Sequence, residues 1–340
     1  MTYPLITTII LTYRRPHLLK KALQSVLSQT YPHFQVIICD NASGDETASV
    51  VAEFAKKDPR IKYFCHEKNI GMLGNYQFGL SLVNTDFFSF LSDDDAVLPN
   101  FYETTLQEFQ KHPDAGFVAG STIILSPKGR TIRIPLSYWP REGKYNPPDG
   151  ALEMIGKYPV PTSVLFSKKV IKHVSIDFEN PIYWDCDYLF QTASIFPIVI
   201  SKKPCAIFRH HDQSFSNQKN SDIYEEAFNK LLKNIQKNKN LTTEKSQSAI
   251  SLILYDLAKC RKHFFLLSLM GGKFEEAYEI AKIIQQHPAF KYKSLVYICT
   301  AKICKVFPVC LYGIRLLKSL KPLIWNFKNR KNKKYASYLN

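Results

Sequence analysis

The chain has 340 residues, of which 45% are hydrophobic and 13% aromatic, so it is long enough for one large domain or two ordinary ones. This composition excludes an intrinsically disordered protein. The formal net charge of +16 is concentrated late in the chain: residues 221–340 carry a net charge of +14, whereas the first 220 residues are nearly neutral at +2. We therefore expect one domain over 1–220 and a helical, basic domain over 221–340.

The first ninety residues alternate between apolar, strand-like runs and segments of helical period. Runs rich in β-branched and aromatic residues predict buried strands at 5–13, 34–40, 61–67 and 87–91. Apolar residues at helical spacing predict helices within 15–31, 41–57 and 75–84, with Ser43 or Asp45 as the cap of the second. This alternation predicts an α/β fold with a mainly parallel sheet and helices on both faces.

The pattern changes twice after this region. Residues 115–217 mix short strands with Pro-rich and aromatic loops, and later residues show a helical period over 223–237, 248–270 and 273–286. The eight cysteines form no CxxC pair and no zinc-ligand spacing, so we expect free thiols in a reducing compartment. No membrane-spanning run and no secretory signal are visible, which favours a cytoplasmic protein.

Three adjacent carboxylates, Asp93, Asp94 and Asp95, directly follow the strand predicted at 87–91. Adjacent carboxylates repel one another and need solvent, a basic partner or a bound cation. An acidic turn would explain them, but Asp40 also stands at the end of a predicted strand. Because the carboxyl ends of parallel strands meet at one edge of a sheet, where ligands of open α/β sheets bind, the sequence predicts a ligand site there.

Three segments resemble the family 2 glycosyltransferases, which have the GT-A fold: TTIILTYRRPHLLKKALQSVLSQTYPHFQVIICDNASGDET, NIGMLGNYQFGL and FFSFLSDDDAVLP. The resemblance covers residues 5–216 and is weaker in its later part. It implies a GT-A-type, Rossmann-like sheet followed by a C-terminal helical region. It also implies inverting transfer of a sugar from a nucleotide-diphosphate donor, in particular a UDP-sugar, to a hydroxyl of a saccharide or lipid-linked acceptor. The expected context is the synthesis of a cell-surface polysaccharide or lipopolysaccharide.

The resemblance implies which residues meet the nucleoside. Asp40 would accept a hydrogen bond from the imide N–H of uracil, as a carboxylate does well. The backbone around Thr12, Tyr13 and Arg14, at the end of the first strand, would border the nucleoside. Asp93 would face the ribose.

Two further segments are expected on the diphosphate side. Asn69, Gly71 and Asn75 would lie in the loop before the strand at 87–91, where many relatives carry an arginine; the alternative is a turn with asparagine caps. Arg209 and His211 match an Arg–His pattern next to the diphosphate and the metal. For these two, the alternative is a hydrogen-bonded surface turn.

The aspartate run resembles the DxD-type metal motif of the family. Ser92 stands at the usual first Asp, Asp94 would hold the metal, and Asp95 would be an alternative ligand or would support the ligands. A hard divalent cation, Mn²⁺ or Mg²⁺, takes oxygen ligands and shares them with diphosphate.

Inverting transfer also needs a base that deprotonates the acceptor hydroxyl. In WDCDYLFQTA, Trp184 replaces the usual Glu, and Asp185 takes the position of the base. Asp187 is the second candidate, and a helix cap is the other interpretation of Asp185. Thr162 and Ser163 would line the acceptor side, unless they are turn hydroxyls.

Two other functions stay open. A nucleotidyltransferase would show a Gly-rich, basic loop after the first strand, which LTYRRPHLL lacks. A non-catalytic nucleotide-sugar-binding or scaffold protein that keeps the fold would not need Asp40, Asp94 and Asp185 together.

The segment 294–334 interleaves apolar and aromatic residues with lysine and arginine. On helices this pattern is typical of a segment that lies on an anionic membrane surface, which would place the protein at the inner face of the cell membrane. The alternatives are packing on other helices or a homo-oligomer. No nucleic-acid-binding module is recognisable, so we expect no nucleic-acid partner.

Overall fold

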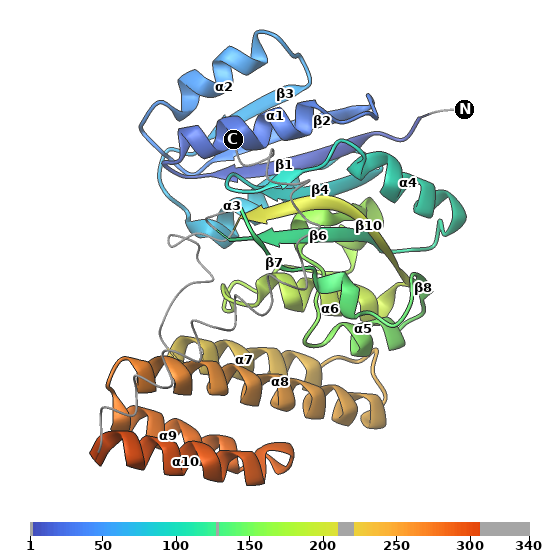
Figure 1. Cartoon of the computed structure of the whole chain (residues 1–340). Helices are drawn as coiled ribbons and strands as arrows, with labels where there is room; N and C mark the ends of the chain where they lie inside the picture. The colour runs from blue at the N-terminus through green and yellow to red at the C-terminus, as the bar shows by residue number, and fades with distance from the viewer. Residues whose placement is uncertain (1–2, 127–128, 210–220, 307–340) are drawn as a thin grey trace. The chain divides into compact units, whose positions relative to one another are not determined.

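The computed structural model describes residues 3–126, 129–209 and 221–306 (Figure 1). Two compact units are present. One combines Met1–Ser216 with Lys237–Lys245, and the other combines Asn217–Gln236 with Ser246–Asn340. The change in net charge near residue 220 predicts a single boundary. It does not predict that Lys237–Lys245, which come after this boundary, belong to the first unit.

The first unit is built on one mixed sheet with the strand order β3-β2-β1-β4-β9-β6-β10-β5, in which β7 pairs with β6 and β8 with β10. The strands are β1 (Ile6–Thr12), β2 (Phe34–Asp40), β3 (Ile61–Cys65), β4 (Phe87–Ser92), β5 (Ala96–Val97), β6 (Phe117–Leu125), β7 (Thr131–Arg133), β8 (Gly143–Tyr145), β9 (Val164–Ser167) and β10 (Ile198–Arg209). The strands β3, β2, β1 and β4 are parallel to their neighbours in this group, and β10 is parallel to β6. The predicted α/β fold is confirmed, with antiparallel pairs concentrated in the later half of the sheet.

The helices of this unit are α1 (Pro16–Leu27), α2 (Thr47–Ala55), α3 (Gly71–Ser81), α4 (Phe101–Lys111), α5 (Asp149–Met154) and α6 (Trp184–Ile195), with short 3₁₀ turns η1 (Pro135–Tyr138), η2 (Pro161–Ser163) and η3 (Lys168–Lys172). They cover both faces of the sheet. Ile10 of β1 lies in one core cluster with Leu23 of α1, whereas Ile9 points to the other face and meets Gly79 of α3. Every residue of β1 and β2 is buried, the polar ones included, so both strands carry apolar residues on both faces of the sheet.

One local expectation was wrong, and one pair of alternatives is resolved. Gly71 and Asn75 lie in helix α3 rather than in a loop, because Asn69 ends the loop by accepting a hydrogen bond from the Gly71 N–H at 2.8 Å. Of the two cap candidates for α2, Ser43 donates its hydroxyl to Asp40 at 2.5 Å, whereas Asp45 accepts the N–H of Thr47, the first residue of the helix, at 2.9 Å.

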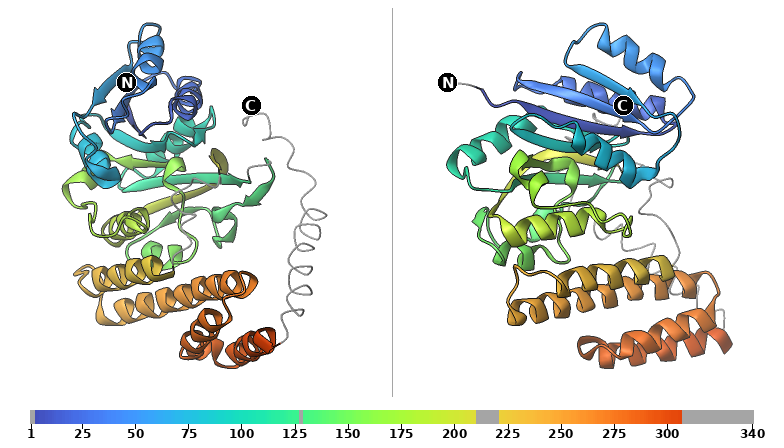
Figure 2. Two further views of the ribbon diagram at one scale, coloured as in Figure 1. Left: turned by 90° about the vertical axis from the view of Figure 1, so that its left-hand side faces the viewer. Right: turned by 180° about the vertical axis from the view of Figure 1, so that it is seen from behind.

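The described part of the second unit is helical, as the sequence predicts. Its elements are α7 (Ser221–Gln236), α8 (Thr243–Met270), α9 (Phe274–Gln285), η5 (Pro288–Phe290) and α10 (Lys291–Val306). Helices α7 and α8 run side by side as a hairpin, visible in both views of Figure 2. A tight turn with Gly272 at φ +77° joins α8 to α9. Within the described ranges, no helix is long and apolar enough to cross a membrane.

Candidate functional site

The strand ends converge as predicted. Thr12, the last residue of β1, pairs in register with Asp40, the last residue of β2, and Leu11 pairs with Ser92, the last residue of β4. The next residue along the chain, Asp93, accepts a hydrogen bond from the Thr12 hydroxyl at 2.9 Å. One edge of the sheet therefore carries the carboxylates of Asp40 and of the aspartate run.

Asp40 is buried, and both of its carboxylate oxygens have partners. Oδ1 accepts from the N–H and the hydroxyl of Ser43 at 3.0 and 2.5 Å, and Oδ2 accepts from the Tyr63 hydroxyl at 2.6 Å. Burial and the Asp40 carboxylate both raise the pKa of Tyr63, so this phenol stays a donor. These contacts fix the direction of the Asp40 carboxylate; its contact with uracil stays a prediction.

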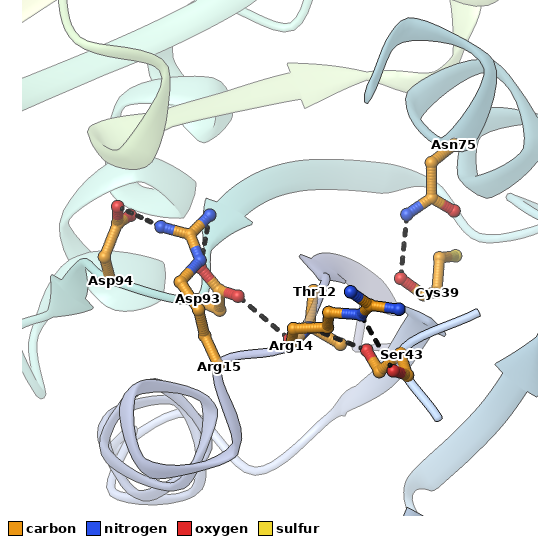
Figure 3. A network of polar contacts seen from close by, with 8 residues as sticks. All are labelled: Thr12, Arg14, Arg15, Cys39, Ser43, Asn75, Asp93 and Asp94. Atoms are coloured by element: carbon orange, nitrogen blue, oxygen red, sulfur yellow. Dashed lines mark hydrogen bonds and ion pairs between the residues drawn. The ribbon is translucent and has the colours of Figure 1, made fainter. Parts of the chain in front are cut away.

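Two consecutive arginines leave the end of β1 in different directions (Figure 3). Arg14 has φ +55°, in the left-handed region that side chains other than glycine seldom adopt. Its backbone N–H donates to the Ser43 hydroxyl at 2.8 Å, and its Nε donates to the Ser43 carbonyl at 3.2 Å. Its guanidinium also lies over the Tyr13 ring, 5.1 Å from the centroid.

Arg15 turns to the aspartate run instead. Its two terminal nitrogens lie 3.1 Å from Asp93 Oδ1 and 2.9 Å from Asp94 Oδ2. Sequence reasoning missed this residue. The available signal was a cation at the end of β1, beside the strand that ends at the aspartates.

The three adjacent aspartates have different surroundings. The Asp93 side chain is fully buried and that of Asp94 is 15% exposed. Burial raises the pKa of Asp93 to about 7, against the opposing effect of Arg15. Asp95 accepts from the Thr162 hydroxyl at 2.6 Å and from the Arg209 N–H at 3.1 Å, so it ties the run to η2 and β10. Its pKa is also raised, chiefly by burial.

The donor chemistry of this run fits a hard divalent cation. Among the described residues, the buried Asp93 Oδ1 has no hydrogen-bond partner, and it lies 3.1 Å from a guanidinium nitrogen of Arg15. Asp94 offers a second, partly exposed carboxylate, and such oxygens are what Mn²⁺ and Mg²⁺ prefer. In the part of the chain that the structure describes, no three His, Cys, Asp or Glu side chains gather as a metal group. His211 lies outside the described residues.

The first turn of α6 lies on the other side of Tyr76, a buried residue of α3. The Tyr76 ring packs on Trp184 with centroids 4.1 Å apart, and its hydroxyl is hydrogen-bonded to Ser92. Burial raises the pKa of Tyr76, and the charges of Asp185 and Asp94 raise it further. Tyr76, which sequence reasoning did not select, therefore lies between Asp185 and the aspartate run.

The two base candidates differ in what they contact. The Asp185 residue as a whole is partly exposed. Its Oδ1 accepts a hydrogen bond from the Cys186 N–H at 2.8 Å, and the burial of its carboxyl group raises the pKa of this group. Asp187 is 1% exposed, and its Oδ2 accepts from Gln191 at 2.5 Å on the next turn of the same helix. The geometry favours Asp185 as the group that meets a ligand, and its role stays a prediction.

The other predicted residues brace the site. The Asn75 amide donates to the Cys39 carbonyl at 2.9 Å and is hydrogen-bonded to His66, so it joins α3 to the end of β2. Asn69 accepts from the Asn41 amide at 3.0 Å, which fixes the segment before Gly71 to the loop after Asp40.

Thr162 and Ser163 were predicted to line the acceptor side. The Thr162 hydroxyl donates a hydrogen bond to Asp95, and the Ser163 hydroxyl donates one to the Gly120 carbonyl at 2.7 Å. Both side chains are buried, at 4% and 0% exposure. Their hydroxyls hold η2 to the sheet, and their predicted contact with an acceptor is not tested by this geometry.

Comparison with known families identifies this arrangement. Residues 7–174 match the model of glycosyl transferase family 2. The chain contains a family 2 glycosyltransferase domain. The predicted resemblance is thereby confirmed over β1 to β9, the part that carries Asp40 and the aspartate run.

Curated relatives of this glycosyltransferase domain match over a limited length. One is the GalNAc(5)-diNAcBac-PP-undecaprenol beta-1,3-glucosyltransferase of Campylobacter jejuni, 37% identical over 106 residues, which are 31% of this chain and 34% of that protein. Another is the UDP-Glc:alpha-D-GlcNAc-diphosphoundecaprenol beta-1,3-glucosyltransferase WfgD of Escherichia coli, 30% identical over 122 residues, which are 36% of this chain and 47% of the relative. The matches thus span between a third and a half of these relatives.

Solved structures support the GT-A fold over a larger part of the chain. The Staphylococcus aureus protein TarS, residues 1–349 in complex with UDP-GlcNAc, superposes with a TM-score of 0.66 at 14% identity, covering 88% of this chain and 90% of that one. The mannosyltransferase PcManGT of Pyrobaculum calidifontis, in complex with GDP-Man and Mn²⁺, has a TM-score of 0.55 at 12% identity and covers 90% and 88%. At these identities the likeness concerns the fold alone.

Proposed function

We propose that this glycosyltransferase transfers a sugar from a UDP-sugar to a hydroxyl of a lipid-linked saccharide, with inversion at the sugar carbon. The observation that carries the proposal is the placement of two carboxylate groups around Tyr76, with Asp93 and Asp94 at the end of β4 and Asp185 at the start of α6. The names of the relatives support this choice, since one includes UDP-Glc and both include an undecaprenol-linked acceptor. UDP-glucose is therefore the first donor to test.

Asp185 is suited to act as the base. Its burial raises its pKa, so the ionised form takes a proton more readily than a solvated carboxylate. In the proposed reaction the acceptor oxygen forms a bond to the sugar C1, the bond from C1 to the diphosphate oxygen breaks, and the acceptor proton passes to Asp185. The nucleoside diphosphate leaves with the electron pair of the broken bond.

The donor side is held by the β-strand ends. Asp40, fixed by Ser43 and Tyr63, would receive the base of the nucleoside, and Asp93 would lie at the ribose. Asp94 would hold Mn²⁺ or Mg²⁺, with His211 as a further candidate ligand. When bound, such a cation supplies positive charge that stabilises the departing diphosphate.

A panel of nucleotide sugars with Mn²⁺, Mg²⁺ or EDTA tests this function. We expect UDP-sugars with a metal to raise the melting temperature of the full chain and to be slowly hydrolysed. Asp94→Asn should lose both effects, whereas Asp114→Asn, which changes an exposed residue paired with Lys144, should keep them. Binding without hydrolysis or transfer would favour the alternative, a non-catalytic nucleotide-sugar-binding protein, and no binding would reject the donor assignment.

We also propose that the protein works at an anionic membrane surface, where a lipid-linked acceptor would be found. Helix α10 carries lysines and no acidic residue, and one stripe of it exposes apolar side chains: Leu295, Val296, Ile303 and Val306, which are 47%, 64%, 52% and 67% exposed. Lys291 and Lys302 lie on the same helix, and this combination is typical of a helix that lies in a membrane interface. The rest of the basic segment, from residue 307 on, lies outside the described residues.

A further inference from the structure

Arg15 stands where a cation between Asp93 and Asp94 would be expected. One guanidinium nitrogen lies 3.1 Å from Asp93 Oδ1 and another lies 2.9 Å from Asp94 Oδ2, so a single side chain bridges both carboxylates (Figure 3). Within the described ranges Asp93 Oδ1 has no hydrogen-bond partner, and the Arg15 guanidinium supplies a positive charge next to it. The Asp94 oxygen belongs to the carboxylate that is proposed to hold the divalent cation, and Asp93 is its neighbour in the run.

We propose that Arg15 is a resident counterion of the Asp93–Asp94 pair that moves to the donor diphosphate when the divalent cation binds. The proposal rests on the proposed function and adds a positioning role for a residue that the family comparison does not assign. A guanidinium and a metal ion cannot occupy the same carboxylate oxygens, so the two cations compete. The displaced guanidinium is stabilised only when another anion is available to pair with it.

The surroundings of Arg15 allow such a movement. Its side chain is 36% exposed, whereas Asp93 is fully buried and held by Thr12, so the arginine is the partner that can move. Its backbone is fixed as the start of α1, where its carbonyl accepts the Leu19 N–H at 3.0 Å. The side chain therefore swings from a fixed point at the edge where the diphosphate is proposed to lie. A planar guanidinium binds diphosphate oxygens as well as it binds carboxylates.

This exchange makes metal binding and nucleotide binding cooperative. Without nucleotide, a metal ion must displace Arg15 and leave its charge without a partner. With a nucleoside diphosphate present, the displaced guanidinium gains one. By linkage, UDP then strengthens Mn²⁺ binding by the same factor by which Mn²⁺ strengthens UDP binding.

The test measures Mn²⁺ binding to the full chain, with and without UDP, by calorimetry and by the electron paramagnetic resonance of free Mn²⁺. The variants are wild type, Arg15→Gln and the control Lys20→Gln, which removes one positive charge from an exposed residue of α1. We expect Arg15→Gln to bind Mn²⁺ alone about tenfold more tightly than wild type, because the competing cation is gone; this factor lies in the usual range of coupling between two ligands. UDP should then strengthen Mn²⁺ binding by a smaller factor than in wild type. Lys20→Gln should bind Mn²⁺ alone as wild type does.

The proposal is overturned if Arg15→Gln binds Mn²⁺ alone with unchanged or weaker affinity, or if UDP strengthens binding equally in both proteins. If Arg15→Gln does not melt cooperatively, Arg15→Lys replaces it. One ammonium reaches a single carboxylate, so Mn²⁺ affinity should rise in the same direction. If UDP and Mn²⁺ bind together in wild type but neither Arg15→Gln nor Arg15→Lys changes Mn²⁺ affinity, only the role of Arg15 is wrong. If wild type does not bind UDP with Mn²⁺ at all, the proposed donor chemistry fails first.

Discussion

The carboxyl groups of this protein differ in their burial, and the direction of their pKa shifts differs accordingly. Burial raises the pKa of Asp93, Asp95 and Asp185, whereas hydrogen bonds from Thr47 and Arg60 lower the pKa of the exposed Asp45 and of Asp58. Strongly perturbed carboxyls that gather at one place are typical of functional sites. The three raised groups all lie next to the end of β4 or across Tyr76 from it.

Asp185→Asn should abolish most of the transfer activity. The substitution keeps the shape and the hydrogen bond from Cys186 but removes the proton acceptor, so we expect transfer to fall by about 10²-fold or more. Calorimetry with UDP and Mn²⁺ should give a dissociation constant close to that of wild type. Asp187→Asn is the matched comparison, because it removes the same charge two residues along. Loss of transfer in Asp187→Asn alone would move the base to that residue.

The same variant makes a prediction about stability. Because burial raises the folded-state pKa of Asp185, its protonated form is favoured in the folded state, and this contribution is lost as pH rises through the folded-state pKa. At neutral pH the buried ionised carboxylate therefore costs stability. Asp185→Asn should be more stable than wild type towards urea at neutral pH, and the difference should disappear below the ordinary pKa of an aspartate. Equal stability of both proteins at neutral pH would show that the carboxylate is solvated.

The sequence indicated which residues end the strands, but not where side chains turn afterwards. Asp40, Asp93 and Asp94 were found because strand ends are visible as the end of an apolar run. Arg15 and Tyr76 were missed because their places depend on the left-handed residue before α1 and on packing between α3 and α6. Neither feature leaves a periodic signal in the chain.

At the scale of elements, α3 approaches β1 unusually closely. A Cβ added at Gly79 would lie 2.5 Å from the Ile9 Cγ2, so only glycine allows this contact without movement. Gly74, on the same helix, would place its Cβ 3.4 Å from Ile70, an ordinary contact. Since α3 also carries Asn75 and Tyr76, this packing sets the position of part of the site.

Gly79→Ala should therefore destabilise the protein. We expect a loss of about 1–3 kcal/mol in the free energy of unfolding, typical of overpacking in a core. Gly74→Ala should instead be neutral or stabilising by about 0.5–1 kcal/mol, because alanine loses less conformational entropy in a helix. Urea denaturation of the three proteins measures both changes. A stable Gly79→Ala protein would mean that α3 can shift on the sheet at little cost.

Element types were more predictable than element boundaries. The strand predicted at 34–40 coincides with β2, and the helical period over 273–286 matches α9 within one residue at each end. The start of α3 was missed by four residues because Gly71 and Gly74 disfavour helix on propensity, whereas the hydrogen bond from the Gly71 N–H to Asn69 and the packing on β1 stabilise it. The antiparallel later half of the sheet was harder to predict, since short strands between loops carry little periodicity.

At the scale of the whole molecule, charge and exposed apolar surface coincide in the C-terminal part. The last fifty residues contain 12 basic residues and no acidic one. The described beginning of this segment is α10, whose apolar stripe was defined above. Each lysine or arginine close to an anionic surface contributes about 1 kcal/mol, so several acting together suffice for reversible binding.

Full-length protein should sediment with vesicles that contain anionic phospholipid, and salt should weaken this binding. The double variant Val296→Glu/Ile303→Glu should bind several-fold less, because it places charge in the apolar stripe. Ile132→Glu is the control, since Ile132 is a comparably exposed residue of β7, at 44% exposure. If the double variant sediments like wild type, α10 is not the membrane-binding helix, and if no protein sediments, the membrane proposal is wrong.

Lys237–Lys245 belong to the first unit, although α7, which precedes them in the chain, belongs to the second. This order affects both folding during synthesis on the ribosome and the design of chimeras. Helix α7 leaves the exit tunnel before Lys237–Lys245, the last piece of the first unit. The first unit therefore stays incomplete while part of the second unit is already synthesised. The end of this last piece is joined to α5 by the Lys245–Asp149 ion pair at 2.9 Å. A chimera with one crossover near residue 220 would take this last piece from the wrong parent. A chimera that exchanges helical units between relatives therefore needs junctions on both sides of residues 237–245.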